Sequence, residues 1–217
     1  TGNVAADQQQ ESVTYYDGLG RPKQSIAKQA GGQRQDIITH IGYDAFGRQA
    51  KDFLPYAQGS GSLLFRTGVV ADTTNQFYQN KYPDDFAGVS LPEVNAFSEK
   101  VFDNSPLNRV LEQAAPGADW AVGSGHTFKF DYQTNTEADV VQLFSVSHPN
   151  NDSQQIQLEH TGTYQPHQLY KTSTKDENWN PNQYYPNEHT TEEYKNKQGQ
   201  IVLKRTYNQR HWHDTYY

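Results

Sequence analysis

Hydrophobic and polar residues alternate in short runs along most of the chain, and Gly, Asn, Asp or Pro separates these runs. Alternation with a period of two is typical of half-buried β-strands. On this pattern we expect strands over residues 24–27, 37–43, 48–53, 109–113, 126–132, 140–146, 155–160 and 200–207. The sequence therefore predicts an all-β fold of antiparallel hairpins with long loops and little helix.

Helical periodicity is scarce. Residues 75–82 and 92–101 are each predicted to form one or two helical turns, and residues 137–144 fit a helix or a strand. Residues 175–189 are rich in Asn, Pro and Glu, which favours a long loop.

Three segments share an aromatic residue, then Asp, a short linker, and Gly-Arg or Asn-Arg. The first turn unit is residues 16–21, the second is 43–48, and the third is 102–109, which is two residues longer. Asn stands in the third unit where Gly stands in the others, and both residue types tolerate the left-handed region. The candidate structural residues of these turns are Tyr16, Asp17, Gly18, Gly20, Arg21, Tyr43, Asp44, Gly47, Arg48, Phe102, Asp103, Asn108 and Arg109.

The chemistry of the turn units favours a structural role. Asp is expected to accept turn N–H groups, and Asp17-Gly18 to supply the positive φ of a tight hairpin turn. Arg can pair with an Asp of its own or the adjacent unit, or stack on a Tyr ring. Because the same set recurs at every turn, a catalytic carboxylate–Arg pair is disfavoured. Residues 193–200 form a weaker fourth unit, with Lys195 in place of Asp and Gln200 in place of Arg.

Composition narrows the class of protein. Only 34% of residues are hydrophobic, yet 13% are aromatic, which suits a two-faced sheet built on Tyr and Phe. A net charge of −7 argues against nucleic-acid binding, and no apolar run approaches the ~20 residues of a membrane span. The lack of Cys excludes thiolate metal sites and Cys nucleophiles. The chain has no Met and begins with Thr1, so we expect it to be a piece of a longer protein.

Other candidate sites are weaker. His211 and His213 can lie on one strand face but need a third metal ligand. A calcium loop would use Asp176, Asn178, Asn180 and Asn182, but Gly and Glu are missing at the required positions. We therefore expect no metal, no cofactor and no enzymatic activity. Possible glycosylation residues are Thr73 and Asn151, both in predicted loops.

The turn units also suggest a division of the chain. Residues 1–11 are predicted to be a polar tail or incoming connection. Residues 12–113 would carry the first repeats. Residues 114–217 would form further hairpins with long loops, leading into another repeat beyond the chain end.

The aromatic-Asp-x-x-Gly-Arg units resemble the tyrosine-aspartate (YD) repeat of Rhs and teneurin-type proteins. Residues 15–25 and 43–56 look specifically like the domain at the start of the repeat region in a group of bacterial Rhs-repeat proteins. The resemblance covers residues 12–111 firmly and is loose from there to Tyr217. In that family, successive hairpins form a spiralling β-sheet shell that encloses a C-terminal segment, often a toxin.

The resemblance implies a structural, non-enzymatic segment of a large secreted or bacterial cell-surface protein. Its partners would be the remaining repeats, or an associated chain, by strand pairing, and a component of a secretion machinery, with no nucleic acid and no membrane insertion. The alternative is a carbohydrate- or partner-binding module that uses exposed aromatic residues and loops. For it the sequence offers Trp120, Trp179, Trp212, Tyr184 and Tyr185.

Overall fold

The computed structural model describes residues 9–59 and 61–217. It divides the chain into two compact units, unit 1 (Thr1–Thr127) and unit 2 (Phe128–Tyr217). Most of the tail predicted over residues 1–11 lies outside the described residues. The predicted division after residue 113 rests on repeat content, whereas the two units are defined by packing, so that division stays a prediction.

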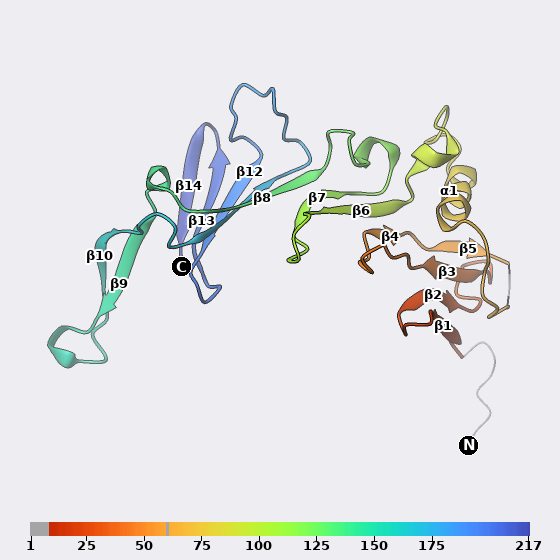
Figure 1. The fold of residues 1–217 in the computed structure, drawn as a ribbon, viewed down its shortest axis with the longest axis horizontal. Helices are drawn as coiled ribbons and strands as arrows, with labels where there is room; N and C mark the ends of the chain where they lie inside the picture. The colour runs from red at the N-terminus through yellow and green to blue at the C-terminus, as the bar shows by residue number, and fades with distance from the viewer. Residues whose placement is uncertain (1–8, 60) are drawn as a thin grey trace, which may run out of the picture. The chain divides into compact units, whose positions relative to one another are not determined.

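Unit 1 contains a four-stranded antiparallel sheet in the order β1-β2-β3-β5. Its strands are β1 (Ser12–Tyr16), β2 (Pro22–Ala27), β3 (Asp36–His40) and β5 (Tyr56–Gln58). Helix α1 (Val70–Lys81) lies against β5 (Figure 1). The core of this sheet consists of Ile26, Ile38 and Tyr56, and Phe77 of α1 packs against them.

A second set of strands in unit 1 runs in the order β4-β6-β7. These strands are β4 (Lys51–Phe53), β6 (Phe97–Phe102) and β7 (Val110–Ala114). Two short 3₁₀ helices flank them, η2 (Leu91–Val94) and η3 (Ala118–Trp120). Asn75 of α1 connects the helix to η2 and to the start of β6. Its side chain donates to the carbonyl of Leu91 and accepts from the N–H of Ala96.

Unit 2 is a five-stranded antiparallel sheet in the order β8-β11-β12-β13-β14, together with the hairpin β9-β10 (Figure 1). The sheet strands are β8 (Phe128–Thr134), β11 (Tyr170–Lys175), β12 (Thr190–Lys195), β13 (Ile201–Asn208) and β14 (His211–Tyr216). The remaining elements are β9 (Gln142–Ser147), β10 (Gln157–Thr163), η4 (Glu137–Asp139) and η5 (Pro149–Asn151). The core of unit 2 consists of Val141, Leu169, Tyr194 and Leu203.

The all-β fold predicted from alternation is confirmed, because the chain forms antiparallel sheets with little helix. Of the one or two helical turns predicted over residues 92–101, only η2 forms, and the rest is wrong because β6 follows, paired on both sides by β4 and β7. The predicted turns over residues 75–82 underestimate α1, which begins at Val70. No side chain caps its first turn, so the usual sequence signal for a helix start is missing. In the described part of the chain, no helix has the length and apolarity needed to cross a membrane.

Candidate functional site

The first two turn units fold with the same side-chain contacts. Asp17 Oδ1 accepts hydrogen bonds from the N–H groups of Leu19 and Arg21 at 2.9 and 3.0 Å. Arg21 Nε then donates to Asp17 Oδ2 at 2.8 Å. The second turn unit repeats these contacts around Asp44 and Arg48 at 2.7 to 2.9 Å. Each Asp therefore satisfies the turn backbone and pairs with the Arg of its own unit, which is one of the alternatives that the sequence left open.

The third turn unit keeps this arrangement despite its two extra residues. Arg109 donates its N–H to Asp103 Oδ1 at 3.1 Å and its Nε to Asp103 Oδ2 at 2.8 Å. Ser105 Oγ adds a hydrogen bond to Asp103 Oδ2 at 2.8 Å. The insertion is thus absorbed at the tip of the turn, while the contacts at its base are unchanged.

These contacts favour the charged carboxylates. The backbone N–H groups of Arg21 and Arg48 are the main reason that the pKa values of Asp17 and Asp44 are lowered. For Asp103 the side chain of Arg109 is the main cause of a lowered pKa. All three Asp residues are therefore ionised at neutral pH, as pairing with Arg requires.

The left-handed position of each turn is the residue immediately before Arg. Gly20 has φ 75°, Gly47 has φ 78° and Asn108 has φ 51°. The expectation that Gly18 supplies the positive φ is wrong, because Gly20, two positions further on, is the left-handed residue and Gly18 lies outside the positive-φ range. Gly and Asn occupy this position because they adopt left-handed backbone at the lowest cost.

Successive turn units in unit 1 are connected by their Arg side chains. The guanidinium of Arg21 lies 4.3 Å from the ring centroid of Tyr43, in the second unit. The guanidinium of Arg48 lies 4.6 Å from the ring centroid of Phe102, in the third unit, and donates to Asn108 Oδ1 at 3.0 Å. We call this arrangement the turn ladder. Each Arg holds its own Asp and stacks on the aromatic residue of the following unit.

The tips of the three turn units are exposed and apolar. Leu19, Phe46 and Leu107 each stand immediately before the left-handed residue, with exposed fractions of 78%, 83% and 73%. The N–H groups of Leu19 and Phe46 take part in the turn, and the guanidinium of Arg48 lies 5.0 Å from the ring centroid of Phe46. The three equivalent tips therefore place apolar side chains in solvent at the same position of each unit.

The fourth unit has the same backbone turn, one residue out of phase with the predicted alignment. Asn196 Oδ1 accepts from the N–H groups of Gln198 and Gln200 at 3.0 Å each. Gly199 has φ 82° and occupies the left-handed position. The expectation that Lys195 replaces Asp is therefore wrong, because Asn196 takes that place. Tyr194 consequently lies one residue before the aromatic position and is completely buried.

A buried polar chain crosses the sheet of unit 1. Gln24 Nε2 lies 3.1 Å from His40 Nδ1, and His40 Nε2 lies 3.1 Å from Tyr56 Oη. The Gln24 amide also donates to the carbonyl of Arg66 and accepts from its N–H, at 3.0 and 2.8 Å. These two bonds fix the amide orientation, so His40 Nδ1 must accept and the ring is neutral. Burial lowers the pKa of His40, in agreement with a neutral ring.

Asp36 fastens residues 61–66 to the same sheet. Its side chain is fully buried and accepts from the N–H groups of Gly61 and Ser62 and from Arg66 Nη2, each at 2.9 Å. Burial alone would raise the pKa of Asp36, but these donors and the N–H of Gln29 outweigh it and lower the pKa. The carboxylate is therefore a charged structural anchor.

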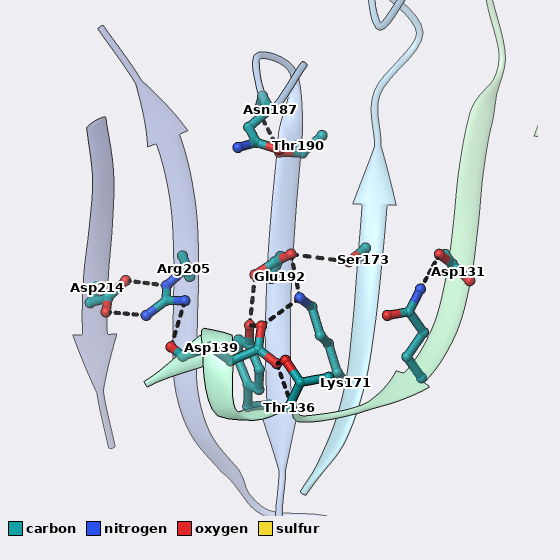
Figure 2. A network of polar contacts seen from close by, with 12 residues as sticks. Asp131, Thr136, Asp139, Lys171, Ser173, Asn187, Thr190, Glu192, Arg205 and Asp214 are labelled. Atoms are coloured by element: carbon teal, nitrogen blue, oxygen red, sulfur yellow. Dashed lines mark hydrogen bonds and ion pairs between the residues drawn. The ribbon is translucent and has the colours of Figure 1, made fainter. Parts of the chain in front are cut away.

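Unit 2 contains a second buried polar network (Figure 2). Lys171 Nζ lies 2.8 Å from Asp139 Oδ1 and 2.8 Å from Glu192 Oε1. Tyr194 Oη lies 2.8 Å from Asp139 Oδ1 and 2.7 Å from Glu192 Oε2, so its single proton serves one carboxylate at a time. Tyr194 is completely buried, and its contact with Asp139 helps to hold η4 onto the sheet.

The network sets two cations, Lys171 and Arg205, against three carboxylates, Asp139, Glu192 and Asp214. Burial would raise the pKa of Asp139, but hydrogen bonds from Lys171, Thr136 and Tyr194 outweigh it and lower the pKa to about 2. Burial raises the pKa of Tyr194, and the two carboxylates raise it further. Arg205 extends the network, because its Nε and Nη2 donate to the two carboxylate oxygens of Asp214 at 2.7 and 2.8 Å (Figure 2).

The two weaker candidate metal sites are the histidine pair of β14 and the loop after β11. His211 and His213 lie exposed on β14. Asp176 and Asn180 accept N–H groups two residues further on, within the loop itself. Across the described residues, no three His, Asp or Glu side chains are grouped so as to hold a metal.

The two glycosylation candidates also differ in setting. Thr73 is in helix α1, where its hydroxyl donates to the carbonyl of Val69, so its predicted place in a loop is wrong. The structure places Asn151 at the end of η5, between β9 and β10.

The aromatic residues proposed as a carbohydrate surface are largely engaged with their neighbours. Lys175 Nζ lies 4.0 Å from the ring centroid of Trp179, and the ring centroid of Trp212 lies 5.0 Å from that of Tyr207. Trp120 stacks edge-on against His126. Tyr184 is 86% exposed, and its neighbour Tyr185 lies under the guanidinium of Arg210.

Sequence reasoning missed both buried networks. One signal was present, since Thr136 and Asp139 form a capping box, which is readable as Thr-x-x-Asp. Asp36, His40 and Lys171 carry no such local pattern, because their partners lie far away in the chain.

The chain matches a known family of protein domains. The model of a family described as "Domain of unknown function (DUF6443)" matches residues 1–134. No curated protein and no solved structure matches the chain.

Proposed function

Since this chain belongs to the DUF6443 family, a domain of unknown function, we propose a role for it from its own turn units. The role is that of a structural, non-enzymatic segment of a large Rhs-repeat protein, secreted or held at a bacterial cell surface. In that protein the YD-type hairpins would build part of a β-shell that encloses or presents a C-terminal, toxin-like cargo.

The turn ladder is the observation that carries this proposal. Arg21 stacks on Tyr43, and Arg48 stacks on Phe102 while it holds Asn108. The first two units use their Asp internally and their Arg both internally and toward the following unit. Such a rule of assembly needs only neighbouring units, so it extends to any number of repeats.

Strand pairing supplies the partners in this proposal. Among the described strands, β14 pairs only with β13 and β1 pairs only with β2. Unpaired strand edges accept further strands through backbone hydrogen bonds. The remaining repeats of the parent chain, or an associated chain, would add there, and a component of a secretion machinery would recognise the finished body.

The test is protection of the cargo in the complete parent protein, purified from its native source. Limited proteolysis followed by mass spectrometry should show that the C-terminal segment resists digestion in the wild-type protein. A parent protein carrying both Arg21→Ala and Arg48→Ala should release that segment faster, because two links of the ladder are removed. Arg34→Ala is the matched control, since Arg34 is exposed and lies outside the turn units.

Two results would overturn the proposal. One is digestion of the C-terminal segment at the same rate in the wild type and in the double variant. The other is a native polypeptide that ends close to Tyr217 with no cargo attached.

A further inference from the structure

A pocket of about 570 Å³ opens at one end of the sheet of unit 2. Three threonines line it, Thr174 at the end of β11, Thr191 at the start of β12 and Thr206 near the end of β13. Thr174 stands directly opposite Thr191, and Thr191 directly opposite Thr206. Residues paired in this way share one face of a sheet, so the three side chains form a row along the pocket.

The wall of the pocket is a long loop that is already ordered. The N–H of Asp176 donates to the carbonyl of His189 at 2.9 Å, which closes the base of the loop. Gln183 Nε2 donates to the carbonyl of Glu188 at 2.8 Å and braces it from inside. A ligand that enters this pocket would therefore meet a preformed wall and would lose little free energy in ordering it.

His189 has a left-handed backbone conformation, with φ 63°. Here it brings His189 Nδ1 to 3.2 Å from Asp176 Oδ2. With Nδ1 on the carboxylate, Nε2 makes no hydrogen bond within the described part of the chain and is available to a ligand.

The polar groups that line the pocket are largely uncommitted. Within residues 9–59 and 61–217, the hydroxyl groups of Thr174, Thr191 and Thr206 make no hydrogen bond, and neither do the side chains of Glu188 and Asn208. Each of these groups can donate to, or accept from, a ligand hydroxyl. Their number favours a ligand that carries many hydroxyl groups.

Charge and shape narrow the class of ligand. No Lys or Arg lines the pocket, whereas Asp176 and Glu188 do, which disfavours phosphates and other anions. Phe128, 42% exposed, offers an apolar ring at the edge of the polar row. The pocket volume falls within the ~300–1,000 Å³ typical of small-molecule sites.

We propose that this pocket binds a short neutral saccharide. The C–H face of one sugar ring would lie on Phe128, and its hydroxyl groups would bond to the threonine row, Glu188 and His189. None of the three tryptophans of the chain lines this pocket. The proposal is independent of the structural role proposed above, because it concerns unit 2 alone.

Saturation-transfer difference NMR on the 217-residue chain tests this directly. The neutral probes are cellotriose, maltotriose, chitotriose and mannotriose, and the anionic probe is trigalacturonic acid. We expect transfer to at least one neutral probe and none to the anionic one. Absence of transfer to all four neutral probes, or equal transfer to the anionic one, would overturn the proposal.

Variants locate the binding. Thr191→Val keeps the side-chain shape and removes one hydroxyl, so affinity for the retained probe should fall about two- to tenfold, as for one hydrogen bond. Thr172→Val is the matched control, because Thr172 lies on the same face of β11 but outside the pocket. If both variants bind the probe as tightly as the wild type, the pocket is not the site.

Discussion

At the scale of single residues, backbone conformation separates two glycines of the same turn. Gly20 has φ 75°, whereas Gly18 lies outside the positive-φ range, and an added Cβ would meet nothing within 4 Å at either position. Space is therefore equal at the two positions and only the backbone differs. This makes them a matched pair for measuring what the turn requires.

We predict that Gly20→Ala lowers the free energy of unfolding of unit 1 by about 1–2 kcal/mol, the cost of left-handed backbone with a Cβ. Gly18→Ala should be neutral, or stabilising by up to about 1 kcal/mol, because alanine restricts the unfolded chain. Urea unfolding followed by circular dichroism measures both. A larger loss in Gly18→Ala than in Gly20→Ala would contradict the assignment of the left-handed position.

The buried His40 gives unit 1 a pH dependence. A protonated ring would place an N–H against the Gln24 amide donor, which the backbone of Arg66 holds in place. Because burial lowers the folded-state pKa of His40, the unfolded chain binds more protons between that value and about 6.5. Stability is therefore complete above pH 6.5 and falls as the pH decreases below it. The anchoring carboxylates, whose pKa values are lowered, lose their contribution only below about pH 4.

We predict that the melting temperature of unit 1 decreases between pH 7 and pH 5 in the wild type, and that this slope flattens in His40→Gln. Thermal melts at a series of pH values measure the slope, which is independent of any constant loss in the variant. His148→Gln should keep the wild-type slope, since His148 is exposed in unit 2. An unchanged slope in His40→Gln would exclude His40 as the titrating group.

At the scale of elements, the network of unit 2 fixes a short, strained connection to the sheet. Val140 ends η4 with φ 46°, an unfavourable conformation for a β-branched residue. Asp139 beside it is bound by Lys171, Tyr194 and Thr136. The strain persists because the neighbouring residue is held from β11 and β12 at once.

We predict that Tyr194→Phe destabilises unit 2 by about 1.5–3 kcal/mol, the value of a hydrogen bond to a charged group. The ring remains in the core, so the loss reports the hydroxyl alone. Tyr170→Phe is the control, because Tyr170 is 60% exposed and its hydroxyl makes no hydrogen bond within the described residues. Denaturant unfolding gives both values, and equal losses would show that the buried hydroxyl contributes nothing.

How far the sequence predicts these elements depends on how local their causes are. Alternation indicates β13, and the internal contacts of Asp17 and Arg21 follow from spacing within six residues. By contrast, β6 has no helix-excluding pattern and forms a strand because two other strands pair with it. Lys171 reads as an ordinary surface lysine until β12 and η4 bring carboxylates to it. The pocket was missed for the same reason, since its threonines come from three strands.

At the scale of the whole molecule, the chain consists of two units with separate cores. Ile26, Ile38 and Tyr56 stabilise unit 1, and Tyr194 and Leu203 belong to the core of unit 2. Substitutions in separate cores, with no shared partners, have additive effects on free energy.

We therefore predict that the combination of Gly20→Ala and Tyr194→Phe gives the sum of the two single losses, to within about 0.5 kcal/mol. The free energies come from denaturant titrations fitted with one transition for each unit. A coupling larger than this would contradict the prediction, because it would mean that the two substituted sites interact energetically.

The tips of the turn units are places where extra residues can be inserted. The third unit carries two extra residues, yet Asp103 and Arg109 keep the contacts seen between Asp17 and Arg21. The length of the tip can therefore change without loss of the contacts at the base of the turn. A short antibody epitope placed between Ala45 and Phe46 should be displayed in solvent while the fold beneath it is retained. The measurements are antibody capture and a thermal melt. Capture of a protein with the wild-type melting curve would make the second turn unit an attachment point for labels.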